Sequence, residues 1–290
     1  MSKEADTTIV SSDSFGCIHV LEPKSQHTHT AILLHGRGST GEEFSEELFD
    51  TKLSGNITLA ENLPGWRWVF PSSRELWSTA FEEEMPAWFE AHSLTDITAR
   101  QDLQPAGIRE SVRHLEGILN EEVQRLGGKA EKVVLGGVSQ GGAIGLWTLL
   151  CPSNAERRLG AFIGASTWLP FATNIDTFLG KDAISSRDDG KAETDSNEGD
   201  AFVVDMMTQT KSSLAHRGPF LSTPVFLGHG IDDAYVDIEL GQQARHVLTQ
   251  IGLTVEWKEY SGAEQEGHWL KAPEEVDDIA RFLSTHVANL

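Results

Sequence analysis

The stretch "VLGGVSQGGAIGLWTLL", residues 134–150, decides the fold class of this chain. It begins as a buried strand, passes through glycines around a single serine, and continues as an apolar helix. Its centre fits the pattern G-x-S-x-G, in which the serine occupies a sharp turn between a strand and a helix. The flanking residues Gly137 and Gly141 must be small, because side chains there would collide with the strand and the helix. We therefore predict that Ser139 lies at the tip of a strained turn and acts as a nucleophile.

Short apolar runs on both sides of this turn predict the strands of a mostly parallel sheet. Each run is rich in β-branched residues, is bounded by turn signals and is followed by a longer amphipathic segment. The runs are 30–36, 66–72, 132–139, 160–166, 223–230 and 253–260. Helices are predicted over 108–126, which ends at Gly127 and Gly128, and from about Pro273 onward. This alternation predicts a single α/β domain over residues 1–290, with helices on both faces of the sheet.

Two segments lie outside the alternation. Residues 7–10 and 15–21 are expected to form an edge hairpin before the first crossover. Residues 181–200 are acidic and nearly free of large apolar side chains, so we expect a mobile loop, followed by a short helix over 201–215. We interpret the insertion as a permissive surface loop, with a lid over a site as the alternative.

The charge balance limits the partners of the chain. Its 290 residues carry 44 acidic and 23 basic side chains, a formal net charge of −21. Such a surface repels phosphate backbones and anionic membranes, so we predict no nucleic-acid partner. There are only two cysteines, no run of membrane-spanning length, and no signal-peptide or lipidation pattern, so we expect a soluble cytoplasmic protein. The sequence makes no prediction about the oligomeric state.

A serine nucleophile needs a base and an acid that orients the base. In this fold class the chain order is serine, acid, histidine. Asp232, Asp233 and Asp237 follow the next-to-last predicted strand, and His268 follows the last one, so all lie where parallel strands end. Spacing alone leaves the choice of aspartate open. The other downstream histidines fit the order less well, and we interpret His229 as a brace for the acid loop.

One motif suggests a different function. "GRGSTG", residues 36–41, fits the G-x-G-x-x-G fingerprint of dinucleotide-binding proteins. That fingerprint also needs an acidic residue at the end of the second strand to bind the ribose. Here the strand runs into Phe70 and Pro71, which argues against nucleotide binding.

Five motifs together resemble the acyl-protein thioesterase family, also called the phospholipase/carboxylesterase family, of α/β-hydrolases. The resemblance extends from about Thr30 to Leu283. The motifs are "LLHGRGSTGEEF", "MPAWFE", "LGGVSQGGA", "STWLP" and "HGIDDAYV". The family implies a serine carboxylesterase or thioesterase that forms an acyl-serine intermediate and needs no cofactor and no metal. Its substrates would be small-molecule esters or thioesters, or acylated proteins.

The resemblance also assigns roles to individual residues. Ser139 would be the nucleophile and His268 the base, and the family pattern HG-x-x-D-x-x-V selects Asp233 as the acid. The oxyanion hole would use the backbone N–H groups of Arg37 and Gln140. The substrate pocket would be lined or bordered by three tryptophans: Trp88, Trp168 and Trp269.

Three departures from the family pattern concern the substrate and leave the chemistry unchanged. Arg37 stands where the family commonly has an apolar residue, Trp269 stands where small residues are usual, and the insertion at 181–200 is longer. We therefore keep two alternatives open. One is a pathway-specific thioesterase for a small soluble acyl substrate, and the other is a hydrolase-fold ligand-binding protein with little turnover.

Overall fold

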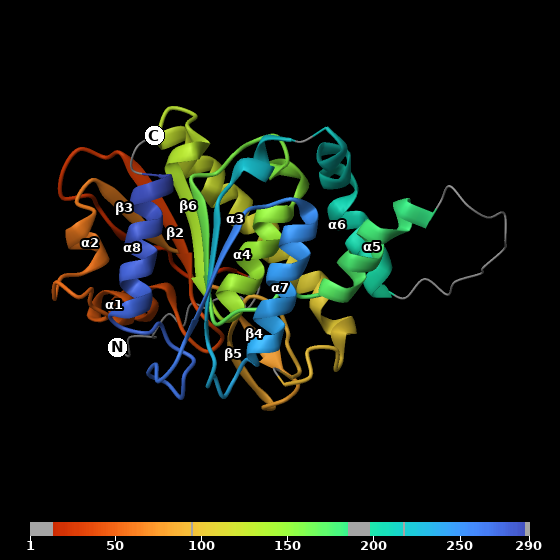
Figure 1. The fold of residues 1–290 in the computed structure, drawn as a ribbon. Coiled ribbons are helices and arrows are strands. Elements are labelled where there is room, and N and C mark those ends of the chain that lie inside the picture. Colours follow the sequence, from red (N-terminus) through yellow and green to blue (C-terminus); the bar gives the residue numbers. More distant parts are fainter. Residues whose placement is uncertain (1–13, 94, 185–197, 217, 288–290) are drawn as a thin grey trace, which may run out of the picture.

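The computed structural model describes residues 14–93, 95–184, 198–216 and 218–287 (Figure 1). A seven-stranded sheet with the order β1-β3-β2-β6-β7-β8-β9 forms its centre. All neighbouring strands are parallel except β1, which pairs antiparallel with β3. The strands are β1 (His19–Leu21), β2 (His29–Leu34), β3 (Trp66–Phe70), β6 (Val133–Val138), β7 (Ala161–Ala165), β8 (Val225–Gly230) and β9 (Val255–Tyr260). All six predicted strands are present, so the predicted mostly parallel sheet is confirmed.

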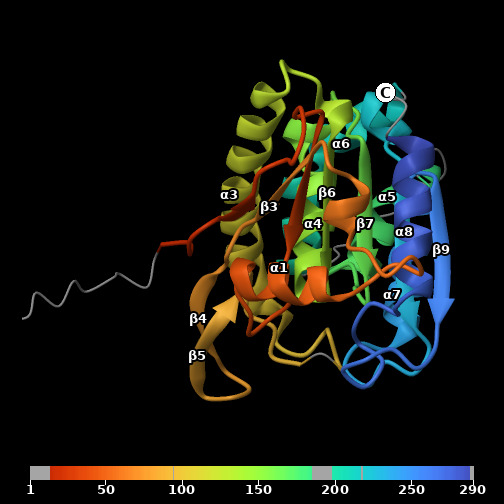
Figure 2. The same ribbon diagram turned by 90° about the vertical axis from the view of Figure 1, so that its left-hand side faces the viewer.

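Helices cover both faces of the sheet (Figure 2). One face carries α1 (Gly41–Asp50), α2 (Leu59–Asn62) and α8 (Glu274–His286), and the other carries α3 (Gln104–Arg125), α4 (Gln140–Leu150) and α7 (Ile238–Ile251). Each face has its own apolar core. The helix ends follow the sequence signals, since Gly127 and Gly128 take positive φ angles after α3, and Pro273 precedes α8.

A short hairpin beside the sheet was not among the predicted elements. β4 (Arg74–Ser78) and β5 (Glu83–Ala87) pair antiparallel with each other and not with the main sheet. Their sequences, RELWS and EEMPA, contain three glutamates and a proline, residues that are depleted in strands. The edge hairpin that the sequence predicts over 7–10 and 15–21 is only partly tested. Residues 15–21 contribute β1 to the sheet edge, and 7–10 lies outside the described residues.

The insertion is more helical than predicted. α5 (Ala172–Ile184) and α6 (Glu198–Ala215) extend into both ends of the predicted loop at 181–200, so the prediction is wrong for 181–184 and 198–200. The cause is apolar packing, because Phe202 of α6 contacts both Phe171 and Trp147. The helix predicted over 201–215 is confirmed, and residues 185–197 lie outside the described part of the chain.

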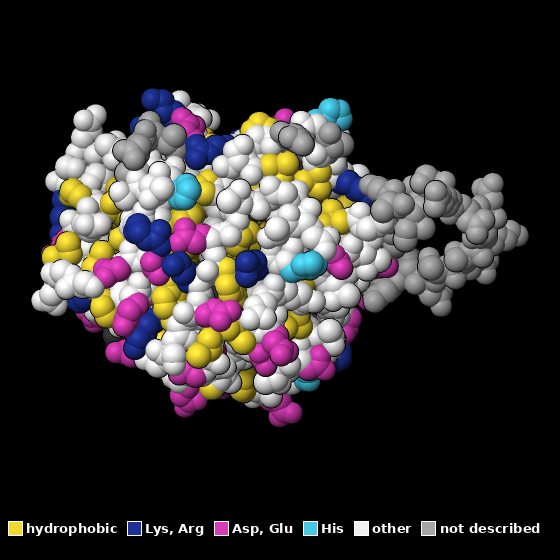
Figure 3. All heavy atoms as spheres, viewed as in Figure 1, with side chains coloured by type: hydrophobic (Ala, Val, Ile, Leu, Met, Phe, Trp, Pro, Cys, Tyr) yellow, Lys and Arg dark blue, Asp and Glu magenta, His cyan; other side chains and the backbone are white. Residues whose placement is uncertain are grey.

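Acidic side chains are unevenly distributed over one face of the molecule. On the face shown in Figure 3 most Asp and Glu side chains lie in the lower half, the end at which the parallel strands finish. None of the helices in the described ranges has the length and apolar character needed to cross a bilayer.

Candidate active site

Ser139 occupies the predicted strained turn between β6 and α4. Its φ of 54° and ψ of −125° lie in a backbone region that residues other than glycine rarely adopt. A Cβ atom at Gly137 would lie 2.6 Å from the Gly141 backbone, and one at Gly141 would lie 2.1 Å from the Leu34 carbonyl oxygen. The glycines are therefore required because the helix, the turn and strand β2 touch through their backbones.

Neighbouring segments hold this turn in place. The Ser139 N–H donates to Ala165 O at 3.0 Å, and the Thr167 hydroxyl donates to Ser139 O at 2.7 Å. The buried Gln140 side chain accepts from the Trp88 N–H at 2.9 Å and donates to the Phe89 carbonyl at 2.8 Å. The residue after the serine thus fixes a segment more than fifty positions earlier, a role that the motif alone did not indicate.

The acid loop after β8 meets the loop that carries His268. His268 Nδ1 lies 2.8 Å from Asp233 Oδ2 and 3.0 Å from Oδ1. Burial opposes ionisation of Asp233, but hydrogen bonds from His229 and His268 and the nearby charge of His268 hold its pKa well below the usual range. The other two aspartates have different partners. Asp232 Oδ2 accepts from the Gly262 N–H at 2.8 Å, and Asp237 caps α7 through the Glu239 N–H.

Ser139 and His268 line one cleft of about 590 Å³. No hydrogen bond joins the Ser139 hydroxyl to the His268 ring in the described structure; such bonds in ligand-free hydrolases often tighten only when substrate binds. The remaining lining residues come from five parts of the chain, 36–47, 81–85, 138, 235 and 265–269. These residues are Gly36, Arg37, Gly38, Ser39, Phe44, Glu47, Phe81, Met85, Val138, Tyr235, Gln265, Glu266 and Trp269.

The loop after β2 lies against the nucleophile. A Cβ atom at Gly36 would come within 3.4 Å of Ser139 Cβ, so the Arg37 backbone runs close to the serine. The Arg37 guanidinium donates to Ala91 O at 2.8 Å and stacks over the Phe81 ring at 4.9 Å. These two contacts hold the side chain against the cleft wall. Burial there lowers the pKa of Arg37.

His35 supports the same loop from below. Its Nδ1 lies 2.7 Å from Gly36 O, and its Nε2 accepts from the Ser73 N–H at 2.9 Å. Burial lowers the pKa of His35 to about 4, so the ring is neutral and donates through Nδ1. Among the described residues, no three His, Cys, Asp or Glu side chains are grouped to hold a metal ion.

Comparison with known proteins shows to which family this chain belongs. The sequence model of a family described as Phospholipase/Carboxylesterase matches residues 15–183, more than half of the chain. The chain belongs to the phospholipase/carboxylesterase family. The predicted family and its class of reaction, ester hydrolysis, are thereby confirmed.

Alignments with individual relatives extend beyond the matched segment and cover nearly the whole chain. Acyl-protein thioesterase 1 of Gibberella zeae is 29% identical over 268 residues, which cover 91% of this chain and 93% of that protein. The same enzyme of Yarrowia lipolytica is 27% identical over 267 residues, covering 91% and 94%. The crystal structure of Zea mays acyl-protein thioesterase 2 superposes with a TM-score of 0.65 at 23% identity, covering 94% of this chain and 100% of that one. This structure confirms the predicted α/β-hydrolase fold.

The three tryptophans that the family resemblance assigned to the pocket have different surroundings. Trp269 lines the cleft, and its indole N–H donates to the Thr51 hydroxyl at 2.9 Å. Trp88 and Trp168 are 0% and 2% exposed and are not among the residues that line the cleft, so the structure does not support their pocket assignment. Both pack in the core on the α4 side, and Trp88 donates to His35 O at 2.9 Å. They support the site from beneath.

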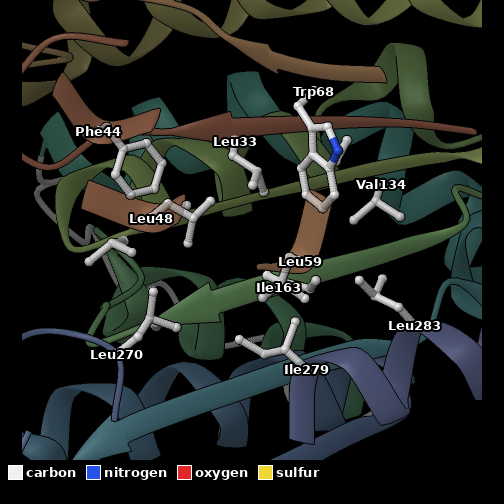
Figure 4. Close-up of a pocket in the computed structure, with 14 residues that line it drawn as sticks. Leu33, Phe44, Leu48, Leu59, Trp68, Val134, Ile163, Leu270, Ile279 and Leu283 are labelled. Atoms are coloured by element: carbon white, nitrogen blue, oxygen red, sulfur yellow. The ribbon is translucent and has the colours of Figure 1, made fainter. Parts of the chain in front are cut away.

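A second cavity lies between the sheet, α1, α2 and α8 (Figure 4). It measures about 40 Å³, and its labelled side chains, including Leu33, Leu48 and Ile279, are all apolar and point into it. Phe44 and Val138 border both this cavity and the cleft. Its apolar lining disfavours ordered water, and its small volume does not fit a long acyl chain, so it is a packing gap behind the cleft wall.

Proposed function

We propose that this chain hydrolyses carboxylic esters and thioesters by a serine mechanism, with Ser139 as nucleophile, His268 as base and Asp233 as the acid that orients the base. One observation carries the proposal: the His268 ring is hydrogen-bonded to the buried Asp233 carboxylate and lines the same cleft as Ser139. The thioesterase names of the relatives from Gibberella and Yarrowia support thioesters as substrates beside esters.

The proposed reaction has two halves. His268 Nε2 takes the Ser139 proton as the serine oxygen attacks the acyl carbon, and Asp233 stabilises the imidazolium that forms. The backbone N–H groups of Arg37 and Gln140 donate to the oxyanion, each contributing roughly 3 kcal/mol. The alcohol or thiol leaves with the proton from His268. Water, deprotonated by His268, then attacks the acyl-serine and releases the acid.

The surface and the cysteines bear on where the chain acts. On the face shown in Figure 3 acidic side chains lie toward the strand ends that carry the site, and the net charge of −21 repels anionic lipids and nucleic acids. Cys17 and Cys151 are both free thiols, which supports a reducing, cytoplasmic location. We propose both small-molecule esters and acylated proteins as classes of substrate.

A fluorophosphonate probe tests the mechanism, because it reacts with an activated serine. We expect labelling of the wild type and of Ser39→Ala, which removes another serine hydroxyl from the same cleft. Ser139→Ala should abolish both labelling and nitrophenyl acetate hydrolysis. Labelling that survives in Ser139→Ala would place the nucleophile elsewhere. A folded wild type that turns over ester no faster than Ser139→Ala would instead support the ligand-binding alternative.

A further inference from the structure

A second histidine contacts the acid from the side opposite the cleft. His229 lies near the end of β8, is 1% exposed, and does not line the cleft. Its Nε2 lies 2.9 Å from the Val236 carbonyl oxygen and 3.5 Å from Asp233 Oδ2. Both of these atoms accept hydrogen bonds, so Nε2 must carry the proton.

The surroundings of the other ring nitrogen agree with Nε2 as the donor. Nδ1 is buried and has no hydrogen-bond partner within the described residues. A Cβ atom at Gly241 would lie only 2.4 Å from Nδ1, and the Trp257 ring packs at 6.1 Å. A proton on Nδ1 would therefore be a buried donor with no acceptor, which leaves Nε2 as the donor of this ring. Helix α7 and strand β9 pack against the Nδ1 side of the ring.

Asp233 depends on its donors because its side chain is fully buried. Oδ1 accepts from the N–H groups of Tyr235 and Val236 at 2.9 and 3.0 Å. Oδ2 is the atom nearest to His268 Nδ1, and it is also the oxygen that faces His229. A buried carboxylate stays ionised only when such donors replace water.

We infer that His229 is a positioning residue for the acid of the active site. Its Nε2–H donates to the Val236 carbonyl and to Asp233 Oδ2, and so holds the 233–236 turn in the geometry that aims Oδ2 at His268. This inference rests on the proposed function, since it assigns His229 to the service of the acid and base named there. His229 itself touches neither substrate nor nucleophile.

Two substitutions of similar volume separate the donor from the packing. Gln at 229 carries an amide N–H near the position of Nε2, whereas Leu has none. With nitrophenyl acetate we expect His229→Leu to lower kcat ~10- to 100-fold, the effect of leaving buried acceptors without a donor, with KM changed less than ~2-fold. His229→Gln should recover most of the lost kcat. Equal losses in both variants, or no loss in His229→Leu, would overturn the inference.

A double-mutant cycle and a spectroscopic signal complete the test. His229→Leu should have little further effect on kcat in the Asp233→Asn background, because its influence passes through Asp233; additive losses would contradict that. The downfield proton resonance of the His268 Nδ1–H should shift or broaden in His229→Leu and persist in His229→Gln. This resonance reports the inference even if Ser139 proves not to be the nucleophile. If His229→Leu does not fold, His229→Asn replaces it, because its shorter amide does not reach Val236 O.

Discussion

At the scale of single residues, Asp232 and Asp233 are neighbours in the chain with different partners. Asp233 is buried and bonded to His268, whereas Asp232 is exposed and accepts from the Gly262 N–H. Asp233→Asn should lower kcat by roughly 10³- to 10⁴-fold, because the amide cannot stabilise the imidazolium and can hold the ring in the wrong tautomer.

The matched control is Asp232→Asn, which should stay within about 3-fold of wild type because its contact is an exposed hydrogen bond. Steady-state kinetics with nitrophenyl acetate measures both. A large loss in Asp232→Asn with activity retained in Asp233→Asn would exchange the roles of the two aspartates.

The sequence predicted the positions of these residues better than their surroundings. The spacing of G-x-S-x-G and the order serine, acid, histidine depend on local turns and strand ends, which short motifs encode. Spacing alone left the choice of aspartate open, and the family pattern pointed to Asp233. The hydrogen bonds of the 233–236 turn orient its carboxylate toward His268. Trp88 and Trp168 do not line the cleft because their segments, 87–89 and 167–169, are buried throughout.

At the scale of elements, the packing of α4 against β2 depends on a glycine. The Cβ atom of an alanine at position 141 would overlap the Leu34 carbonyl oxygen, and both partners are backbone, so neither can move aside. Gly141→Ala should destabilise the fold by roughly 3 kcal/mol or more, by the mechanism of overpacking. Urea denaturation followed by circular dichroism measures this.

Gly117→Ala is the control for that substitution. Gly117 is also helical, but a Cβ atom there meets nothing within 4 Å. Alanine should stabilise α3 by about 0.5–1 kcal/mol, because it reduces the freedom of the unfolded chain. Destabilisation of similar size in both variants would show that the contact with β2 is not what makes Gly141→Ala costly.

The hairpin β4–β5 supplies part of the cleft wall. Phe81 lines the cleft, whereas Trp77 is equally exposed on the same hairpin and does not. Phe81→Ala should raise KM about 3- to 10-fold with little change in kcat, because about 1 kcal/mol of apolar contact is lost away from the reacting atoms. Trp77→Ala should leave both constants near wild type. The same rise in KM for both would mean that the hairpin acts as a whole.

This hairpin also shows why some elements escaped prediction. Its strands mix exposed glutamates with a few apolar side chains and a proline, and they pair only with each other. They therefore lack the apolar run or the alternation by which a strand is recognised. The six parallel strands of the sheet are buried runs with glycine or turn signals at their ends, and these were predictable. Apart from Arg37 and Trp269, which the family resemblance indicated, the cleft wall was not predictable, because it combines side chains from segments that only the tertiary fold brings together.

At the scale of the whole molecule, two buried groups give stability opposite dependences on pH. Burial raises the pKa of Glu275 to about 8, opposed in part by the hydrogen bond from the Lys271 N–H. The folded state therefore holds a proton that the unfolded state has lost between about pH 4.5 and 8, so this group makes stability fall as pH rises through that window. His35, whose pKa is lowered to about 4, makes stability rise with pH between about 4 and 6.5.

The two effects oppose each other up to about pH 6.5, and above it only the loss from Glu275 continues. The wild type should therefore lose stability between about pH 6.5 and 8. Glu275→Gln keeps an acceptor for the Lys271 N–H but cannot ionise. At pH 9 this variant should be more stable than wild type by roughly 2–5 kcal/mol, while the two should nearly match at pH 4.5. Urea denaturation across this pH range measures the difference, and parallel curves for the two proteins would show that Glu275 is ionised in the fold throughout.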